Sequence, residues 1–427
     1  MQKSTGSDTS ASDINRTTPG PRLSEDSGRN GQAAVPEIPF FSQAETFTRL
    51  WPLIERNVRR VFDNGKFSHG EQTAEFEREI AAYTGARHAV AVNSGTDALV
   101  LLLRACGLRP GDGVLVPAYS FFATASSVVL AGGHPQFVDI DPVSYAMGPA
   151  ALAAAVTPRS RFVLPAHLFH GMADMPALGG AARQAGLTVV EDSAEAVGMR
   201  RHGVHAGLHG AGGVLSFFPS KTLGALGDAG AVLTDDSTLA GTVAALRHHG
   251  RLGRTVNNFP AISTASSLPG ANSKMDDVQA AVLLAKMTVL DEDIARRALL
   301  ADRYTERLRK LPGAVCLPRQ AAHGPGDRDV FYVYLIEAEQ RDGLAAHLAL
   351  RGIGTEIYYP LPLHLQPAFA DLGHRQGDFP HAERAAGRAL ALPLYPDLTL
   401  AQADRVCAAI ADFYAAPAPA GDGGCHR

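Results

Sequence analysis

Apolar residues recur at three- and four-residue spacings between about residues 40 and 83, which predicts a helical start to the folded chain. From residue 88 on, short runs rich in Val and Leu alternate with helical stretches. Near-continuous apolar runs are typical of strands buried on both faces, so the alternation predicts a mainly parallel sheet with helical crossovers. The predicted strands are residues 88–92, 114–117, 135–140, 162–165, 187–192 and 214–218. The predicted helices among them are residues 96–107, 120–131 and 174–185.

The pattern changes after about residue 250. Residues 275–311 form one long helical pattern with room for a single break, residues 331–338 alternate like a strand, and residues 341–352 form a helix that ends at a Gly. We therefore expect an α/β protein with a large domain and a smaller α+β domain. The expected parts are a disordered tail (1–36), the large domain (37–311), the small domain (312–415) and a second disordered tail (416–427).

Composition narrows the classes of function. The net charge of the 427 residues is −4 and no Lys/Arg-rich run occurs, so a nucleic-acid partner is not expected. No apolar run is long enough to cross a bilayer and the N-terminus lacks an apolar export signal, which favours a cytoplasmic protein. The four Cys have no metal-ligand spacing, and three His in a Gly-rich stretch, His202, His205 and His209, favour a solvated hairpin over a metal site.

Candidate chemistry lies where the predicted strands end, because ligands of open α/β sheets bind there. Residues 93–96, Asn-Ser-Gly-Thr, open a helix after the first strand, so they suit either a phosphate or a simple helix cap. Asp192 ends a buried run, where its carboxylate is either paired structurally or held against a cationic ligand atom. Lys221 follows another apolar strand among glycines, in a position that can face a cleft.

A phosphate seat, an acidic residue and a lysine, in this order, suggest pyridoxal 5′-phosphate (PLP). This cofactor needs a phosphate site, an amine that bonds to its aldehyde, and an acid that keeps its ring nitrogen protonated. The protonated ring withdraws electrons, and the lysine, once displaced, is a base for the carbon that loses a proton.

Eight segments, in order from about residue 38 to 413, closely resemble the DegT/DnrJ/EryC1/StrS family of PLP-dependent sugar aminotransferases, whose fold is that of aspartate aminotransferase (fold type I). The segments are FEREIAAYTGARHAVAVNSGTDAL, PAYSFFATASSVVLAGGHPQFVDID, HLFHGMADM, VVEDSAEAVG, SFFPSKTLGALGDAGA, GANSKMDDVQAA, YYPLPLHLQPAF and GDFPHAERAAGRALALPLYP. The resemblance implies that Lys221 is the covalent anchor of PLP, that Asp192 pairs with its ring nitrogen and that Phe121 stacks on its ring. The residues implied to hold its phosphate are Gly95, Thr96 and Ser216.

The resemblance further implies a homodimer with a composite active site, in which Asn272 reaches the cofactor phosphate of the partner subunit. It places three side chains near the substrate, each of which could equally be a structural side chain: His167, Tyr359 and His364. The chain departs from the family at Glu195, where Gln is frequent. An ionised Glu cannot donate a hydrogen bond to the cofactor, so Glu195 is protonated, turns away or alters the electronics of the cofactor site.

The other departures concern the substrate more than the cofactor. Lys274 stands where Arg is common, so the chain lacks a guanidinium group that can donate two parallel hydrogen bonds to one acceptor group. His170 and Met172 replace the more usual Gly and Pro in their turn.

The function implied is transfer of an amino group, from L-glutamate, to a keto sugar on a nucleotide carrier. Alternatives are an aminotransferase for a free cyclitol or aminoglycoside ketone, and a PLP-binding regulatory protein without turnover. A deoxysugar dehydratase is disfavoured because that branch has His in place of Lys221. An enzyme that uses Lys221 without PLP would lack a chromophore.

Overall fold

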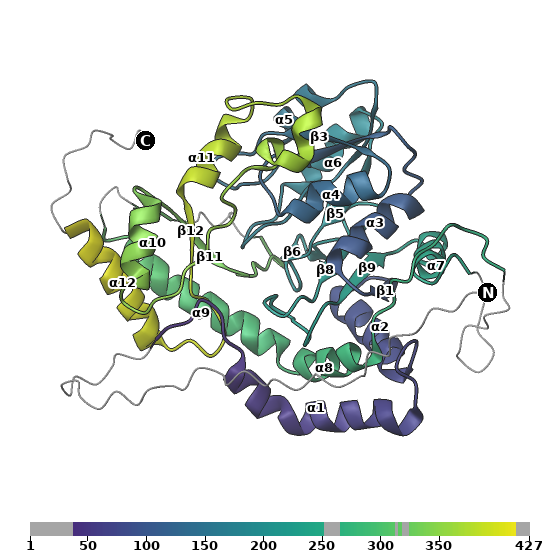
Figure 1. The fold of residues 1–427 in the computed structure, drawn as a ribbon, viewed down its shortest axis with the longest axis horizontal. Coiled ribbons are helices and arrows are strands. Elements are labelled where there is room, and N and C mark those ends of the chain that lie inside the picture. Colours follow the sequence, from purple (N-terminus) through teal and green to yellow (C-terminus); the bar gives the residue numbers. More distant parts are fainter. Residues whose placement is uncertain (1–36, 252–264, 312–314, 318–323, 416–427) are drawn as a thin grey trace, which may run out of the picture. The chain divides into compact units, whose positions relative to one another are not determined.

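The structure is a computed structural model that describes residues 37–251, 265–311, 315–317 and 324–415. Its central feature is a seven-stranded sheet in the order β1-β9-β8-β5-β4-β2-β3 (Figure 1). All its strands are parallel except β9, which pairs antiparallel with β1 and β8. The strands are β1 (His88–Val92), β2 (Gly113–Pro117), β3 (His134–Val138), β4 (Ser160–Val163), β5 (Thr188–Asp192), β8 (Gly212–Ser216) and β9 (Gly230–Thr234). The predicted α/β class and parallel sheet are confirmed, although β9 was not predicted.

Helices cover both faces of this sheet. Along β2, Val114 and Val116 pack into one hydrophobic core and Leu115 into the other, so the strand is buried on both sides. The first face carries α3 (Gly95–Ala105), α4 (Phe122–Leu130) and α7 (Ser237–Leu246). The second carries α2 (Glu71–Thr84), α5 (Pro149–Ala155), α6 (Met175–Gln184) and α8 (Asp277–Met287). Burial on both faces explains why the strands were recognisable as short apolar runs.

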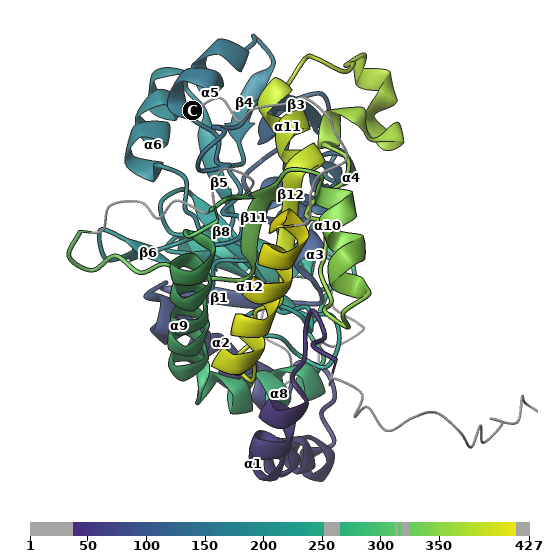
Figure 2. The same cartoon turned by 90° about the vertical axis from the view of Figure 1, so that its left-hand side faces the viewer.

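The C-terminal part contains a separate antiparallel sheet of β10 (Val315–Cys316), β11 (Tyr334–Ala338) and β12 (Ala389–Leu392). Figures 1 and 2 show α9 (Leu290–Leu308), α10 (Arg341–Ala349) and α12 (Leu400–Ala415) beside this sheet, and their apolar residues share one core with it. Short helices α11 (Pro380–Arg388), η2 (Leu363–Leu365) and η3 (Pro367–Leu372) complete this part. The domain boundary at residue 312 stays a prediction, and both predicted tails lie outside the described residues.

The structure defines the extent of three predicted elements. The helical pattern of residues 40–83 forms two helices, α1 (Ala44–Asn64) and α2, since Gly65 ends α1 in the left-handed conformation with φ 66°. Residues 275–311 form α8 and α9, so the long pattern does break once. The strand predicted from residue 331 begins only at Tyr334, because the backbone N–H of Tyr332 bonds to the carbonyl of Phe169 (2.8 Å) instead of joining the small sheet.

The predicted histidine hairpin exists as β6 (Arg200–Arg201) and β7 (Val204–His205), but it is not solvated throughout. His205 is fully buried, and its Nε2 accepts a hydrogen bond from the N–H of Gly198 (2.8 Å). Burial lowers the pKa of His205 to about 3, so a solvated His205 was wrong. Within the described residues, no group of three or more His, Cys, Asp or Glu is arranged to hold a metal ion.

None of the helices that the structure describes is both long enough and apolar enough to cross a membrane.

A buried carboxylate fixes the start of α2. The helix begins after Gly70, which has no side chain to cap it, and Asp277 of α8 supplies the acceptor instead. Asp277 Oδ1 accepts from the N–H and hydroxyl of Thr73 (2.7 Å each), and Oδ2 accepts from the N–H of Gln72 (3.3 Å). A Cβ on Gly70 would lie 2.1 Å from Asp277 Oδ2, so only Gly fits there.

Replacing Asp277 with Ala leaves these buried donors without a partner. We expect D277A to lower the free energy of unfolding by about 2–4 kcal/mol, measured by urea denaturation at neutral pH. The exposed neighbour in D276A is the matched control and should change stability by less than about 0.5 kcal/mol. Equal midpoints for the two variants would show that Asp277 does not cap α2.

Candidate active site

A cavity of about 380 Å³ lies at the carboxyl edge of the large sheet, where β5 and β8 end. It is lined by nine of the eleven residues that the sequence singled out: Gly95, Thr96, Phe121, His167, Asp192, Glu195, Ser216, Lys221 and Tyr359. Asn272 and His364 do not line it. Residues spread over 265 positions of the chain therefore meet at one place, as the rule for open α/β sheets predicts.

Lys221 is held by a carboxylate and an aromatic ring. Its Nζ lies 3.2 Å from Glu195 Oε1 and 4.1 Å from the centroid of the Tyr332 ring. Burial alone would lower the pKa of Lys221, but the charge of Glu195 and the neighbouring Tyr332 outweigh it and raise the pKa above its ordinary value. The amine is therefore held as an ammonium ion in the cavity wall.

Glu195 does not turn away from the cavity. Its Oε1 accepts from Lys221 Nζ and from the hydroxyl of Tyr359 (3.3 Å), and its Oε2 accepts from the N–H of Phe169 (2.9 Å). Every one of these partners is a donor, which is the environment of an ionised carboxylate. Of the three readings of this departure, the structure favours a second negative charge beside the cofactor site.

Asp192 ends β5 with its carboxylate buried beside the cavity. Its Oδ2 accepts from the hydroxyl of Thr124 (2.7 Å), and its Oδ1 accepts more weakly from the N–H of Ala194 (3.3 Å). Burial raises the pKa of Asp192 despite these bonds. A buried carboxylate with two neutral donors is suited to a cationic N–H from a ligand, which would supply the missing charge.

The end of the cavity at the N-terminus of α3 is suited to bind an anion. Ser94 caps α3 by accepting from the N–H of Asp97 (3.1 Å), and the first N–H groups of this helix point out of its N-terminus. A Cβ on Gly95 would lie 2.9 Å from Cβ of Ser216, and a Cβ on Gly230 would lie 2.5 Å from the carbonyl of Ser94. Gly95 therefore lets the helix terminus approach the end of β8, where Ser216 joins the cavity wall, and Gly230 lets it approach the start of β9.

Phe121 and Tyr359 contribute to the apolar wall of the cavity. Phe121 precedes α4 and is 55% exposed although it lines the cavity, so its ring is available to a planar ligand. Its centroid lies 5.9 Å from that of Tyr359, whose N–H bonds to the hydroxyl of Tyr119 (3.1 Å). Tyr359 belongs to the C-terminal part, so this part completes the cavity.

His167 lines the cavity, but both of its ring nitrogens are engaged elsewhere. Nε2 lies 3.0 Å from Glu191 Oε2, and Nδ1 accepts from the N–H of Ala173 (3.4 Å). Glu191 is fully buried and also accepts from the N–H groups of Gly207, His209 and Gly210. Burial alone would raise the pKa of Glu191, but the bond from His167 and these contacts lower it. Because both nitrogens are engaged, His167 contributes the carbon atoms of its ring to the cavity wall.

The structure does not bring the other two predicted residues to this cavity. His364 is buried, with Nε2 3.1 Å from Glu383 Oε1 and its ring 4.7 Å from that of Phe379. These contacts agree with the alternative that His364 is a structural side chain and does not contact the substrate. Asn272 is exposed and its side-chain oxygen accepts from Lys274 Nζ, so its contact with the cofactor phosphate of a partner subunit stays a prediction.

Some residues in or beside the cavity were missed, among them Thr124, which bonds to Asp192 from behind the lining residues. Thr124 lies in the first turn of a predicted helix that starts at the carboxyl edge, a position that could have identified it. Tyr332 was assigned to a strand, although it bonds through its hydroxyl to Ser220 (3.2 Å) and Tyr358 (3.3 Å). Asp228, in the Gly-rich loop, also lines the cavity and carried no signal beyond its charge.

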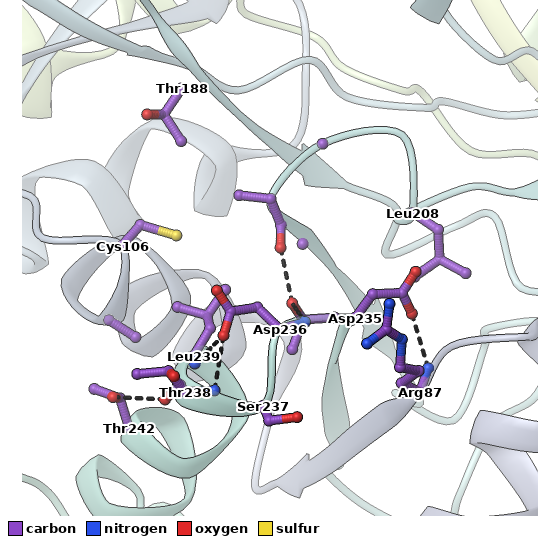
Figure 3. A pocket seen from close by; sticks show the side chains of 15 residues that line it. Arg87, Cys106, Thr188, Leu208, Asp235, Asp236, Ser237, Thr238, Leu239 and Thr242 are labelled. Atoms are coloured by element: carbon purple, nitrogen blue, oxygen red, sulfur yellow. Dashed lines mark hydrogen bonds between the residues drawn. The ribbon is translucent and has the colours of Figure 1, made fainter.

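A larger and more open groove, about 760 Å³, lies at the end of β9 (Figure 3). Its acidic side chains are already used: Asp236 caps α7 by accepting from Thr238 (2.7 Å) and Leu239 (3.1 Å), and Asp235 accepts from the N–H of Arg87 (2.8 Å). Burial raises the pKa of the Cys106 thiol to about 12, which makes it a poor nucleophile. We therefore assign the chemistry to the smaller cavity.

Comparison with known proteins agrees with this site. The sequence profile of the DegT/DnrJ/EryC1/StrS aminotransferase family matches residues 52–411. A pleiotropic regulatory protein of Geobacillus stearothermophilus is 40% identical over 88% of this chain and 98% of its own. A dTDP-3-amino-3,4,6-trideoxy-alpha-D-glucose transaminase of Streptomyces venezuelae is 38% identical over 90% of this chain and 98% of its own.

A solved structure extends the likeness to the fold. DesV of S. venezuelae matches with a TM-score of 0.84 at 37% identity, covering 90% of this chain and all of that one. Aminotransferases of this family depend on PLP, so the predicted cofactor is confirmed and a lysine enzyme without PLP is excluded. The chain belongs to the DegT/DnrJ/EryC1/StrS family and is a PLP-dependent aminotransferase.

Proposed function

We propose that this aminotransferase transfers an amino group from L-glutamate to a keto sugar on a nucleotide carrier, with PLP in the cavity and Lys221 as its covalent anchor. The observation that carries the proposal is that Lys221, Asp192 and the N-terminus of α3 line one cavity. The sugar substrate is supported by the transaminase of S. venezuelae, whose name specifies a dTDP-linked amino sugar.

The residues present fit the cofactor. Asp192 would hold its ring nitrogen, Phe121 would cover one face of its ring, and the N–H groups of Gly95 and Thr96, with Ser216, would hold its phosphate. When bound, PLP supplies a ring that accepts negative charge from the carbon that loses a proton. Asp192 strengthens this effect because its carboxylate stabilises a proton on the ring nitrogen.

Lys221 is the group that moves protons. Its amine, once free, lies beside Glu195, whose carboxylate stabilises the charge that the amine acquires when it takes up a proton. The hydroxyl of Tyr359 bonds to the same Oε1 and thereby helps to hold Glu195 in place. The two carboxylates thus have separate tasks, with Asp192 at the ring nitrogen and Glu195 at the amine.

We further propose a homodimer in the cytoplasm, in which Asn272 completes the phosphate site of the partner subunit. The support is that Asn272 is exposed and does not line the cavity of its own chain.

A role as a PLP-binding regulator without turnover is the second candidate, because the relative from G. stearothermophilus is named a regulatory protein. Lys221 and Asp192 are both in place here, which favours turnover. Incubation with ¹⁵N-labelled L-glutamate and nucleotide-linked keto sugars, followed by mass spectrometry, separates the two roles. A ¹⁵N-amino sugar supports the proposal, and no labelled product from any acceptor favours the regulator.

Loss of the anchor should abolish turnover. We expect K221A to reduce amino transfer at least about 10³-fold while its circular dichroism stays that of the wild type, since the change removes the nucleophile and base. K310A, which removes an exposed lysine, is the control and should keep full activity. Substantial transfer by K221A would contradict the assigned mechanism.

Neutralising Asp192 should slow the chemical step and leave the fold intact. For D192N, we expect kcat to fall by about 10²-fold or more, because an amide does not stabilise the protonated ring nitrogen. D63N, at an exposed position of α1, is the matched control. If D192N has wild-type kcat, Asp192 is structural.

Glu195 should control how readily Lys221 reacts. Because the Glu195 charge raises the pKa of Lys221, E195Q lowers that pKa and leaves more amine neutral at a given pH. The colour that forms when PLP is added to the apoprotein should therefore develop on the order of five times faster at pH 7, with the rate profile shifted to lower pH. E79Q should leave the profile unchanged. An unshifted profile for E195Q would refute the pairing.

A further inference from the structure

A buried lysine outside the cavity is connected through one glutamine to the loop that carries Lys221, residues 217–225. Lys286 belongs to α8 and is 2% exposed. Its Nζ donates to Oε1 of Gln43 (2.7 Å), the residue that precedes α1. Nε2 of Gln43 donates in turn to the carbonyl of Pro219 (3.1 Å), two residues before Lys221. Two hydrogen bonds in sequence therefore join the buried amine to this loop.

Gln43 matches both of its partners. The amine of Lys286 approaches as a donor and a backbone carbonyl can only accept, so the bridging side chain needs one acceptor and one donor. An amide has both, whereas an ionised carboxylate could accept from Lys286 but could not donate to Pro219. When Lys286 is charged, it polarises the amide and strengthens the bond from Gln43 Nε2 to the Pro219 carbonyl.

The surroundings of Lys286 do not provide a carboxylate in direct contact. Its Nζ lies 5.3 Å from the centroid of the Phe47 ring, and its hydrogen-bond partner is a neutral amide. Burial lowers the pKa of Lys286 to about 7. The charges of Asp293 and Asp397 raise this pKa, and that of Arg297 lowers it. Burying an ammonium ion against a neutral acceptor is costly, so its contact with Gln43 is not explained by stability alone.

Other contacts hold the Lys221 loop from its remaining sides. The N–H of Lys221 bonds to the carbonyl of Phe218 (2.8 Å), and the hydroxyl of Ser220 lies 3.2 Å from that of Tyr332. A Cβ on Gly224 would lie 2.3 Å from the carbonyl oxygen of Pro219, so the loop is closely packed at this carbonyl. The bond from Gln43 acts on the same oxygen.

The segment that carries Gln43 is itself fixed to the C-terminal part. Before Gln43, the N–H of Ile38 bonds to the carbonyl of Gly352 and its carbonyl accepts from Gly354 (2.8 Å each). After Gln43, the N–H and hydroxyl of Thr46 donate to the carboxylate of Asp397 (3.0–3.1 Å). Gln43 therefore bonds to the loop from a segment that is held on both sides.

We propose that Gln43 is a positioning residue for Lys221 and that Lys286 strengthens its bond to the Pro219 carbonyl. This bond fixes the backbone two residues before Lys221, where the side chain that reaches into the cavity originates. A misplacement of the order of 1 Å at such a point lowers a rate strongly, because the reacting groups then meet less often in the required geometry. The inference rests on the proposed role of Lys221 as the anchor of PLP.

The variant Q43E separates the two hydrogen bonds. Glutamate has the shape of glutamine and still accepts from Lys286, but it has no N–H for the Pro219 carbonyl. At pH 6, where Lys286 is charged, hydrogen–deuterium exchange of residues 217–225 in the PLP-free protein should become at least about fivefold faster. Exchange in β5 should stay that of the wild type. The colour that forms with PLP at pH 7 should develop at least about threefold more slowly.

A second variant tests the contribution of Lys286. K286M removes the charge and leaves Gln43 Nε2 free to donate, so its loop should exchange faster than that of the wild type and more slowly than that of Q43E. Q376E and K310M make the same kinds of change at exposed positions and should match the wild type in both measurements.

Equal exchange of residues 217–225 in Q43E and Q376E overturns the proposal. Exchange of β5 that accelerates by the same factor also overturns it, because Gln43 would then support the whole fold. So does a looser loop with an unchanged rate of colour formation, since Lys221 would not depend on this bond. Exchange is measured without PLP and is independent of the proposed function. A wild type that forms no colour, together with faster loop exchange in Q43E, would preserve the bond from Gln43 and refute the role assigned to Lys221.

Discussion

The buried carboxylate of Glu195 connects the parts of the chain on which the active site depends. It accepts hydrogen bonds from the backbone after β4, from Lys221 after β8 and from Tyr359 of the C-terminal part. A buried charge is costly unless donors surround it, so the site forms only when these three segments are docked together. The same contacts hold the lysine amine as an ammonium ion opposite Asp192.

The sheet explains why the remaining components meet there. Parallel strands bring their carboxyl ends to one edge, and three of these ends carry a residue that lines the cavity: Ser94 after β1, Asp192 as the last residue of β5 and Ser216 as the last residue of β8. The antiparallel strand β9 returns Gly230 beside Ser94, where only a glycine permits the approach that closes the anion end. The larger groove at the end of β9 also has polar side chains, but its acids are already used: Asp236 caps α7 and Asp235 accepts from the N–H of Arg87.

The residues at the strand ends were predictable, because their positions follow from the order of apolar runs along the chain. The apolar runs located the sheet, and the position of Asp192 and Lys221 after such runs indicated the cavity. Contacts that depend on tertiary docking were not predictable: Tyr332 has the pattern of a strand residue, yet its backbone bonds to Phe169 and its ring lies under Lys221. His205 looked solvated because Gly-rich stretches are generally exposed, whereas its ring is buried and bonds to the N–H of Gly198. The environment of Glu195 likewise became clear only once its three donors were placed.

The central claim is that Lys221 carries PLP in a site that accepts an amino group from glutamate. The visible absorption spectrum of the purified protein, recorded after incubation with PLP and again after adding L-glutamate, tests it most directly. The account predicts a yellow band that fades on addition of glutamate and returns with 2-oxoglutarate. The absence of a visible band after incubation with PLP would contradict the claim that Lys221 carries the cofactor. A band that glutamate leaves unchanged would contradict glutamate as the amino donor.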